Sequence, residues 1–588
     1  MILLALARGS AQTAIPEAES LQVPTPARLA QIAADATRTG WAAQKDTLHQ
    51  AAKSAYDRDR LAAAEAWLNA YKWSVIFAMN EQEWTPRWIR TVEQAGVNHA
   101  NMPRTYQVRS QPLAAELAPE TQAWLFGHVD FSAKFFALLQ PVDCLPQVLR
   151  ILNRLYLWTP ERFQAYPDLA LAIAVVYDVP APPDWPHAQV TAASLPRGWP
   201  TPTTAFDWWV RQDQAGRTYF RLNRLPADEL KFVVDATASF DDLEWTQVMV
   251  DYPLSLLGRA YAMIAYRTER IAHNQPVWVN GPYTLPSILG TGGICVDQAY
   301  FACQVGKARG VPTLHFSGVG NDGRHAWFGY LGPDQKWVFD VGRYAEQRYV
   351  TGFARDPQTW GRLSDHELAF LSEGFRRLPS YEQSRAHAAF AADFLLRGEY
   401  EAAAKAARKA AGFEPRNVAA WETLLSAEKA LNLPPKQREG TLREAIRAFQ
   451  RYPSLEAAYT NRLAASLRAR GETSAAEVEE NRIVRKNRGD RSDVSVEQAR
   501  LNLVRIMQTR PLPEQVSAYN NLVDTLGRKG GTAFFDQVVV VFAEHLRQLD
   551  QRPEALRAIQ RAQQKMEAAP DRQLGREFAR LAEAMQAN

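Results

Sequence analysis

The sequence predicts an α+β protein in which a small antiparallel sheet, with one helix packed on it, lies between two mostly helical regions. Residues 26–178 place apolar side chains at helical spacing and contain many good helix formers. Residues 313–341 instead show short strand-like runs separated by glycine-rich turns. Beyond residue 363 the strand patterns end and alanine-rich helices follow.

The length of 588 residues is too great for one hydrophobic core and predicts several domains. The best boundary is a stretch with seven prolines at 179–204, which predicts an extended connector because proline fixes φ and lacks an N–H donor. The predicted division is an N-terminal segment at 1–25, a helical domain at 26–178, the connector at 179–204, a domain with mixed helices and strands at 205–363, and a helical repeat domain at 364–588.

Composition excludes several classes of function. The 68 basic and 64 acidic residues leave a net charge of +4, with no concentrated basic face, so nucleic-acid binding is not expected. The three cysteines, Cys144, Cys295 and Cys303, are too few for a disulfide framework, and no CxxC pair suggests a zinc site. We therefore expect neither a metal nor another cofactor.

The N-terminal segment leaves two compartments open. Residues 1–7 are apolar and residues 8–14 end in small side chains, as in the tail of an export signal whose start lies upstream. With such a signal the protein would be secreted or periplasmic, and without it cytoplasmic. No other stretch approaches the roughly 18 apolar residues of a membrane span.

The regions around the sheet have weaker patterns. Residues 206–225 predict a hairpin with its turn at 212–216. Acidic residues after Pro226 predict the start of a helix, and residues 244–271 predict further helix. The many aromatic residues of 26–178 are expected to pack a core rather than line a groove.

A repeat is visible in the C-terminal region. Small and aromatic residues recur at spacings that resemble the tetratricopeptide repeat, in which small side chains let paired helices approach closely; they are Gly398, Tyr400, Ala403, Ala407, Ala410 and Pro415. Weaker echoes follow at Gly471 with Ala476 and at Ala555 with Ala562. A generic helical bundle is the alternative. Either arrangement favours a role in binding a protein partner or in self-packing.

Residues 290–344 carry the chemistry. Glycines at 290, 292 and 293 predict a tight turn, and apolar residues at helical spacing follow Cys295. Cys295 is therefore expected at a helix N-terminus, where free N–H groups and the macrodipole lower a thiol pKa and can stabilise an oxyanion.

Strands at 313–318, 325–331 and 336–341 follow this helix in the prediction. His325 opens the second strand and Asp340 lies near the end of the third, so the two side chains can face one another across an antiparallel pair. A cysteine, a histidine and an aspartate so arranged would supply a nucleophile, its base and the group that orients the base.

This segment resembles the transglutaminase-like core of the papain-like cysteine superfamily. Microbial members show G-x-C-x-D-x-A, then G-[VI]-P, then H-A-W, then a tryptophan shortly before an aspartate. The matching residues are Gly293, Cys295, Asp297, Ala299, Gly310, Val311, Pro312, His325, Ala326, Trp327, Trp337 and Asp340. The resemblance covers under a fifth of the chain, and it implies that 205–363 is a catalytic domain.

The resemblance implies acyl transfer through a thioester, with Cys295 as nucleophile, His325 as base and Asp340 as orienter. A peptide or protein is the implied substrate, and either hydrolysis or transamidation the outcome. The family also uses an oxyanion donor upstream of the cysteine, for which Asn280, Tyr283 and Trp278 are candidates. The alternative function is a non-catalytic scaffold built on the same core.

The neighbouring residues have simpler interpretations. Cys144 and Cys303 are expected as small buried residues and His315 as a structural histidine. We expect Asp297 to brace the helix, and Trp327 and Trp337 to pack the sheet. Arg343 and Tyr344 follow Asp340 closely enough to line the cleft.

Overall fold

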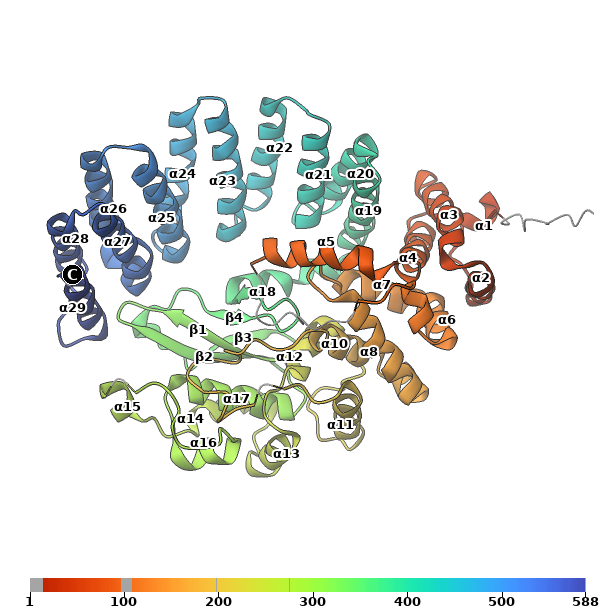
Figure 1. Ribbon diagram of the computed structural model, residues 1–588, viewed down its shortest axis with the longest axis horizontal. Coiled ribbons are helices and arrows are strands. Elements are labelled where there is room, and N and C mark those ends of the chain that lie inside the picture. The colour runs from red at the N-terminus through yellow and green to blue at the C-terminus, as the bar shows by residue number, and fades with distance from the viewer. Residues whose placement is uncertain (1–13, 97–107, 197, 274, 587–588) are drawn as a thin grey trace, which may run out of the picture. The chain divides into compact units, whose positions relative to one another are not determined.

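The computed structural model describes residues 14–96, 108–196, 198–273 and 275–586 (Figure 1). The protein is 66% helical and has one five-stranded antiparallel sheet, which confirms the predicted α+β class. Most of the segment interpreted as an export signal, residues 1–13, lies outside the described residues. Within the described part of the chain, no helix is both long enough and apolar enough to cross a membrane.

The chain forms two compact units whose boundaries differ from the predicted domains. The first unit runs to Ile294 and also takes Tyr300–Leu314 and Arg355–Gly361. The second contains Cys295–Ala299, His315–Ala354 and everything from Arg362 onward. The predicted domain at 205–363 is therefore divided between the units, and the start of the cysteine helix belongs with the sheet and the C-terminal helices.

Helices build the first unit, as predicted for 26–178. Those before the Pro-rich segment are α1 (Glu17–Ser20), α2 (Pro26–Thr39), η1 (Trp41–Gln44), α3 (Lys45–Asp57), α4 (Leu61–Phe77), α5 (Glu81–Gln94), η3 (Leu113–Glu116), α6 (Pro119–Gly127), α7 (Val129–Leu138), α8 (Leu145–Trp158), α9 (Pro160–Ala165) and α10 (Pro167–Val176). Their aromatic residues pack a core: the buried Trp73 ring lies 4.6 Å from that of Phe135 and 5.2 Å from that of Phe77. The prediction of a core role is confirmed.

The Pro-rich segment is irregular as far as Thr201, but it is packed rather than solvated. Trp185 and Leu195 are buried, and the Trp185 ring lies edge-on to that of Trp360 at 5.5 Å. Because these contacts fall inside the first unit, the segment works as a packed part of that unit and not as a spacer.

The hairpin predicted at 206–225 is wrong, because helix α11 (Pro202–Gln214) takes its first part and residues 215–225 contain no strand. The Thr201 side chain accepts a hydrogen bond from the Thr204 N–H, and Pro202 stands at the first helical position, where its missing N–H is harmless. Phe206 and Trp209 then share a buried face at helical spacing.

The helix predicted after Pro226 is confirmed as α12 (Ala227–Val234). The predicted helix at 244–271 is confirmed only in pieces, since Pro253 and Gly258 stand at its breaks. The pieces are α13 (Phe240–Met249), η4 (Leu254–Leu256), α14 (Arg259–Ala262) and α15 (Thr268–Ala272), after which α16 (Leu285–Thr291) leads to the cysteine.

The sheet has the order β3-β2-β1-β4-β5. Its strands are β1 (Thr313–Val319), β2 (Arg324–Leu331), β3 (Trp337–Val341), β4 (Phe353–Arg355) and β5 (Arg362–Ser364), so all three predicted strands are confirmed. β2 and β3 pair with a bulge, because Tyr330 lies opposite Val338 but Phe328 lies opposite Val341. Such a bulge changes which side chains share a face.

Helices follow one another through the rest of the second unit (Figure 1). They are α18 (Asp365–Leu371), η6 (Gly374–Arg377), α19 (Pro379–Leu396), α20 (Tyr400–Phe413), α21 (Val418–Ala430), α22 (Pro435–Ala448), α23 (Pro453–Ala469), α24 (Thr473–Asn487), α25 (Ser492–Thr509), α26 (Leu512–Phe534), the π-helical turn η7 (Phe535–Val539), α27 (Val540–Gln548), α28 (Arg552–Lys565) and α29 (Gln573–Gln586). Gly398 joins α19 to α20 with a φ of +79°, and Ala403 and Ala407 are fully buried. The tetratricopeptide-like character of these helices stays a prediction.

The last helices hold the turn between β1 and β2. The Thr532 N–H donates to the Gly320 carbonyl over 2.9 Å, and its hydroxyl accepts from the Gly323 N–H over 2.8 Å. Arg324, the first residue of β2, forms ion pairs of 2.6 Å with Asp536 and 2.5 Å with Glu577. These contacts fix the strand on which His325 lies.

Candidate active site

Cys295 is the first residue of helix α17 (Cys295–Ala308), so the predicted helix N-terminus is confirmed. The turn before it is tightly held. Gly292 ends α16 with a φ of +80°, and a side chain there would lie 2.5 Å from the Ala265 carbonyl oxygen. The Gly293 N–H donates to that same carbonyl over 2.9 Å. Glycine is therefore required for the chain to enter α17 in this way.

The Cys295 thiol is buried, with 9% of the residue exposed. Backbone N–H groups of Ala326 and Val296 point to the sulfur and favour a thiolate, but burial is the larger effect and raises the thiol pKa. The lowered pKa expected from the helix N-terminus is therefore wrong in direction. Its physical reason is that desolvation of the charged sulfur outweighs the amide dipoles that surround it.

His325 directly precedes Ala326, whose backbone N–H points to the Cys295 sulfur. Its Nε2 is 2.6 Å from the Gly342 carbonyl oxygen, and burial lowers the pKa of the ring below its usual value. A neutral ring beside a carbonyl must carry its proton on Nε2, because a carbonyl oxygen only accepts. Nδ1 is then left unprotonated, and it is the ring nitrogen that can act as a base.

Among the described residues, Asp340 makes no hydrogen bond or ion pair with His325. The aspartate is exposed, and its carboxylate is close enough to Tyr330 to help burial raise the pKa of that phenol. The pairing of β2 and β3 is irregular here, with Tyr330 opposite Val338 but Phe328 opposite Val341, and the Asp340 carboxylate acts on Tyr330. The main-chain carbonyl of Gly342 is the hydrogen-bond partner of the His325 ring at the place where Asp340 was expected.

Two tyrosines enclose the histidine ring. Tyr344 stacks on it at 4.5 Å and 25°, and Tyr349 at 5.3 Å and 28°. Burial, and to a smaller extent the nearby Cys295, raises the pKa of Tyr344. This half-exposed tyrosine therefore lies near both the Cys295 thiol and the His325 ring. The expectation that Tyr344 lines the site agrees with this geometry, whereas no sequence pattern marked Tyr349.

Arg343 has a structural role instead. Its guanidinium pairs with Asp365 over 2.9 Å, donates from Nε to the Tyr349 carbonyl over 2.8 Å, and lies 5.1 Å above the Trp327 ring. With these contacts the side chain holds the segment that bears Tyr349. It therefore supports the ring stack and is not placed to meet a substrate.

The remaining predicted neighbours pack the site. His315 bonds to the backbone of Val296, and burial lowers the pKa of its ring to about 4, as suits a structural histidine. The buried Trp327 indole donates to the Phe339 carbonyl over 2.8 Å, and Trp337 is buried in the sheet. Asp297 is buried in the first turn of α17, where the helix dipole favours a carboxylate.

Of the three candidate oxyanion donors, two are engaged elsewhere in the first unit. The Trp278 indole donates to the Gly281 carbonyl over 3.0 Å, and the Tyr283 hydroxyl is bonded to His187 Nε2 at 3.1 Å. Asn280 is exposed. The donors that lie beside the sulfur are the backbone amides of Ala326 and of the first residues of α17.

Known proteins add no assignment to this geometry. No protein-family model matches the chain, and no curated protein matches it. Among the residues that the structure describes, no group of three or more His, Cys, Asp or Glu side chains could hold a metal ion. The function is therefore argued from the thiol, the imidazole and the groups around them.

The thiol provides a first test. Alkylation of Cys295 by iodoacetamide is expected to become fast only above the ordinary thiol pKa of about 8.5, because burial raises its pKa. Rates would be measured against pH, residue by residue, by mass spectrometry of the folded protein. Cys144 and Cys303 are internal controls that should stay unmodified, since both are almost wholly buried and have raised pKa values. Fast reaction of Cys295 near pH 7 would instead reveal a resting thiolate–imidazolium pair.

Proposed function

We propose that this protein is a transglutaminase-like cysteine enzyme that transfers acyl groups from peptide or carboxamide substrates through a thioester. One observation carries the proposal: a thiol at a helix N-terminus receives the amide of Ala326, and the adjacent His325 is a neutral base with its Nε2 proton held by Gly342. A purely structural cysteine has no need of this arrangement.

The reaction follows from these protonation states. As the Cys295 sulfur attacks the substrate carbonyl, its proton passes to His325 Nδ1 and the carbonyl π electrons move onto oxygen. The backbone N–H groups of Cys295 and Val296 are placed to stabilise that oxyanion. When the C–N bond breaks, the imidazolium returns the proton to the departing amine and leaves a thioester. Water or a second amine then attacks the thioester, and His325 again carries the proton.

The surroundings of His325 suit a transient cation. The Gly342 carbonyl accepts from the ring in both protonation states, so the imidazolium keeps one strong partner when it forms. The stacked Tyr344 and Tyr349 rings offer π faces to the positive charge. Burial keeps the ring neutral at rest, as a general base requires.

Hydrolysis and transamidation use the same residues, and peptide or amide cleavage is the outcome that we propose first. A second candidate is a non-catalytic scaffold. Two observations favour it: the raised pKa of the Cys295 thiol, and the absence among the described residues of a hydrogen bond or ion pair between Asp340 and His325. The two candidates differ in whether a thioester forms.

The test is a pair of assays on the full chain, one for cleavage of a denatured protein substrate and one for incorporation of a fluorescent primary amine into a glutamine-containing peptide. Cys295→Ala should abolish activity in both assays, because no acyl group can be held without the sulfur. Cys303→Ala is the matched control, as it removes a buried thiol from the same helix. A peptide with a chloroacetamide in place of the glutamine side chain would also label Cys295. If Cys295→Ala were as active as Cys303→Ala, the activity would not depend on the Cys295 thiol. That result, or a complete lack of activity and of labelling in the unaltered protein, would favour the scaffold.

A further inference from the structure

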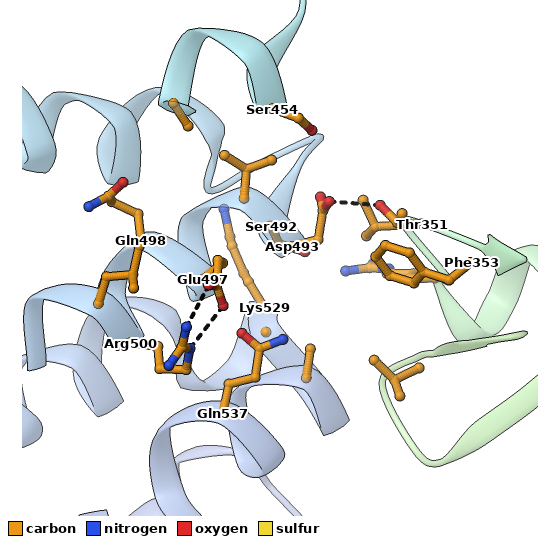
Figure 2. A pocket seen from close by; sticks show the side chains of 18 of the residues that line it. Thr351, Phe353, Ser454, Ser492, Asp493, Glu497, Gln498, Arg500, Lys529 and Gln537 are labelled. Carbon is orange, nitrogen blue, oxygen red and sulfur yellow. Dashed lines mark hydrogen bonds and ion pairs between the residues drawn. The ribbon is translucent and has the colours of Figure 1, made fainter. Parts of the chain in front are cut away.

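Both carboxylates that line a cavity of the second unit are paired with a cation. The cavity has a volume of about 680 Å³ and is lined by the end of β1 and by residues of α23, α25 and α26 (Figure 2). Asp493 pairs with Arg491 over 2.8 Å, and Glu497 pairs with Arg500 over 2.7 Å. Even these partly exposed carboxylates have a counter-charge, and a fully buried carboxylate needs one more.

Two buried aspartates of the first unit, Asp143 and Asp178, depart from this pattern, and they are called the carboxyl pair below. Only 2% and 5% of these residues are exposed, and neither forms an ion pair among the described residues. Asp143 Oδ2 accepts from the Gln140 N–H over 2.7 Å and from the Gln358 amide over 2.9 Å, and Asp178 Oδ2 accepts from the Cys144 N–H over 2.6 Å. The other oxygen of each aspartate, Oδ1, is buried without a hydrogen-bond partner.

The charged groups around the carboxyl pair do not neutralise it. Lys231 of α12 is near, but it pairs with Asp356 over 2.6 Å. Arg150 of α8 pairs with Glu81 over 2.8 Å. The Cys144 thiol between them adds no charge, because burial raises its pKa. Two carboxylates would therefore repel one another here without a cation between them.

A single proton resolves this conflict. A protonated carboxyl that donates to a carboxylate forms a strong, charge-assisted hydrogen bond, and the two Oδ1 atoms are the oxygens left to share it. Burial raises the pKa of Asp143 to about 7, and burial together with the nearby Asp143 raises the pKa of Asp178 well above its ordinary value. The folded protein thus keeps a proton here at pH values at which an exposed aspartate, with a pKa of about 3.9, has lost it.

The carboxyl pair holds a segment that comes from far along the chain. Residues 356–361 join β4 to β5 and belong to the first unit. In this segment the Gln358 amide is buried and donates both to Asp143 Oδ2 and, over 3.0 Å, to the Leu138 carbonyl. Any movement that lets water reach the carboxyl pair would break these bonds.

We propose that Asp143 and Asp178 form a pH-sensitive switch, in which one shared proton keeps residues 356–361 in place and its release to solvent at higher pH loosens that segment. The closed state binds a proton that the opened state releases. Closure is therefore most stable near the ordinary carboxyl pKa of about 3.9 and weakens as the pH rises toward the raised pKa of the carboxyl pair.

Hydrogen exchange of the full chain, resolved by mass spectrometry, measures this opening directly. After correction for the intrinsic pH dependence of exchange, the opening constant of residues 138–144 and 356–361 should rise by up to about tenfold for each pH unit between pH 5 and pH 7, as release of one proton requires. Peptides from α20 in the second unit are the internal reference and should keep the same opening constant.

Asp178→Asn should remove the pH dependence. Its side-chain oxygen can accept from Cys144, and its NH₂ group can donate to Asp143 Oδ1 without a titrating proton. Asp143→Asn should act in the same way with the roles exchanged, so both variants should exchange more slowly than the unaltered protein at pH 7. Asp251→Asn is the matched control, because it removes an exposed carboxylate from the same unit and should leave the pH dependence unchanged.

The proposal is overturned if residues 356–361 of the unaltered protein open equally at pH 5 and pH 7, or if both Asn variants keep the pH dependence. If one Asn variant fails to fold, the other decides. Failure of both would also overturn the proposal, because an amide imitates the protonated carboxyl permanently. Cys295→Ala should open with the same pH dependence as the unaltered protein, so this test is independent of the proposed catalytic function.

Discussion

His325→Ala is expected to lower kcat/KM for peptide or carboxamide substrates by about 10²–10⁴-fold, the usual contribution of a general base. In the proposed mechanism the variant lacks the nitrogen that takes the Cys295 proton. Burial raises the pKa of the thiol, so Cys295 alone would supply little thiolate near neutral pH. Initial rates measured over a range of substrate concentrations would separate kcat from KM. The loss should fall mainly on kcat.

Asp340→Asn is the informative comparison. Because the Gly342 carbonyl and not Asp340 holds Nε2, this substitution should change kcat/KM by less than about threefold, far below the effect of removing a general base. A loss as large as that of His325→Ala would show that the carboxylate reaches the ring during turnover. The pH profile offers a second check. Since burial lowers the pKa of His325 from its ordinary 6.5, activity should persist at pH 6.5 and fall only at lower pH, where the ring becomes protonated.

Lys307→Met is expected to lower the free energy of unfolding by about 3–5 kcal/mol, as is typical when one partner of a buried ion pair is removed. The Lys307 ammonium is almost fully buried in α17, pairs with Asp235, and donates to the carbonyls of Phe232 over 2.6 Å and Thr313 over 3.0 Å. Without the lysine, the Asp235 carboxylate stays buried with no cation beside it. Urea unfolding followed by fluorescence would measure the loss.

Two variants complete this experiment. Lys336→Met removes a lysine whose side chain is 83% exposed and should change stability by about 0.5 kcal/mol or less. Adding Asp235→Leu to Lys307→Met should recover part of the loss, since no unpaired charge then remains in the core. If the double variant were as unstable as the sum of its parts, packing rather than charge would account for the effect.

Local patterns in the sequence predicted much of this architecture. The glycine turn before Cys295 and the helical spacing after it identified the start of α17, because both signals lie within a few residues. The three strands around His325 followed from alternation and turn residues in the same way. Helix α11 is hard to tell from a strand in the sequence, since its aromatic residues suit both and its N-cap, Thr201, lies inside the Pro-rich segment.

The parts that could not be predicted depend on tertiary structure. The contact of His325 with the Gly342 carbonyl depends on how β2 and β3 pair, and the raised thiol pKa of Cys295 depends on burial. Neither has a local signature. The attachment of the β1–β2 turn is a sharper case, because Gly323 and Thr532 lie 209 positions apart in sequence and bond only after the last helices have folded against this turn.

The attachment of the β1–β2 turn to the last helices has a consequence for any shortened version of the protein. A fragment that stops after the sheet would keep Cys295, His325 and Gly342, yet it would lose Thr532, Asp536 and Glu577, which grip the turn at one end of β2. The histidine would then begin a strand with a frayed end. The groups of the candidate site and the residues that hold their strand in place are thus encoded far apart in the sequence. A C-terminal deletion would remove the residues that hold the strand and leave the groups of the site in the chain.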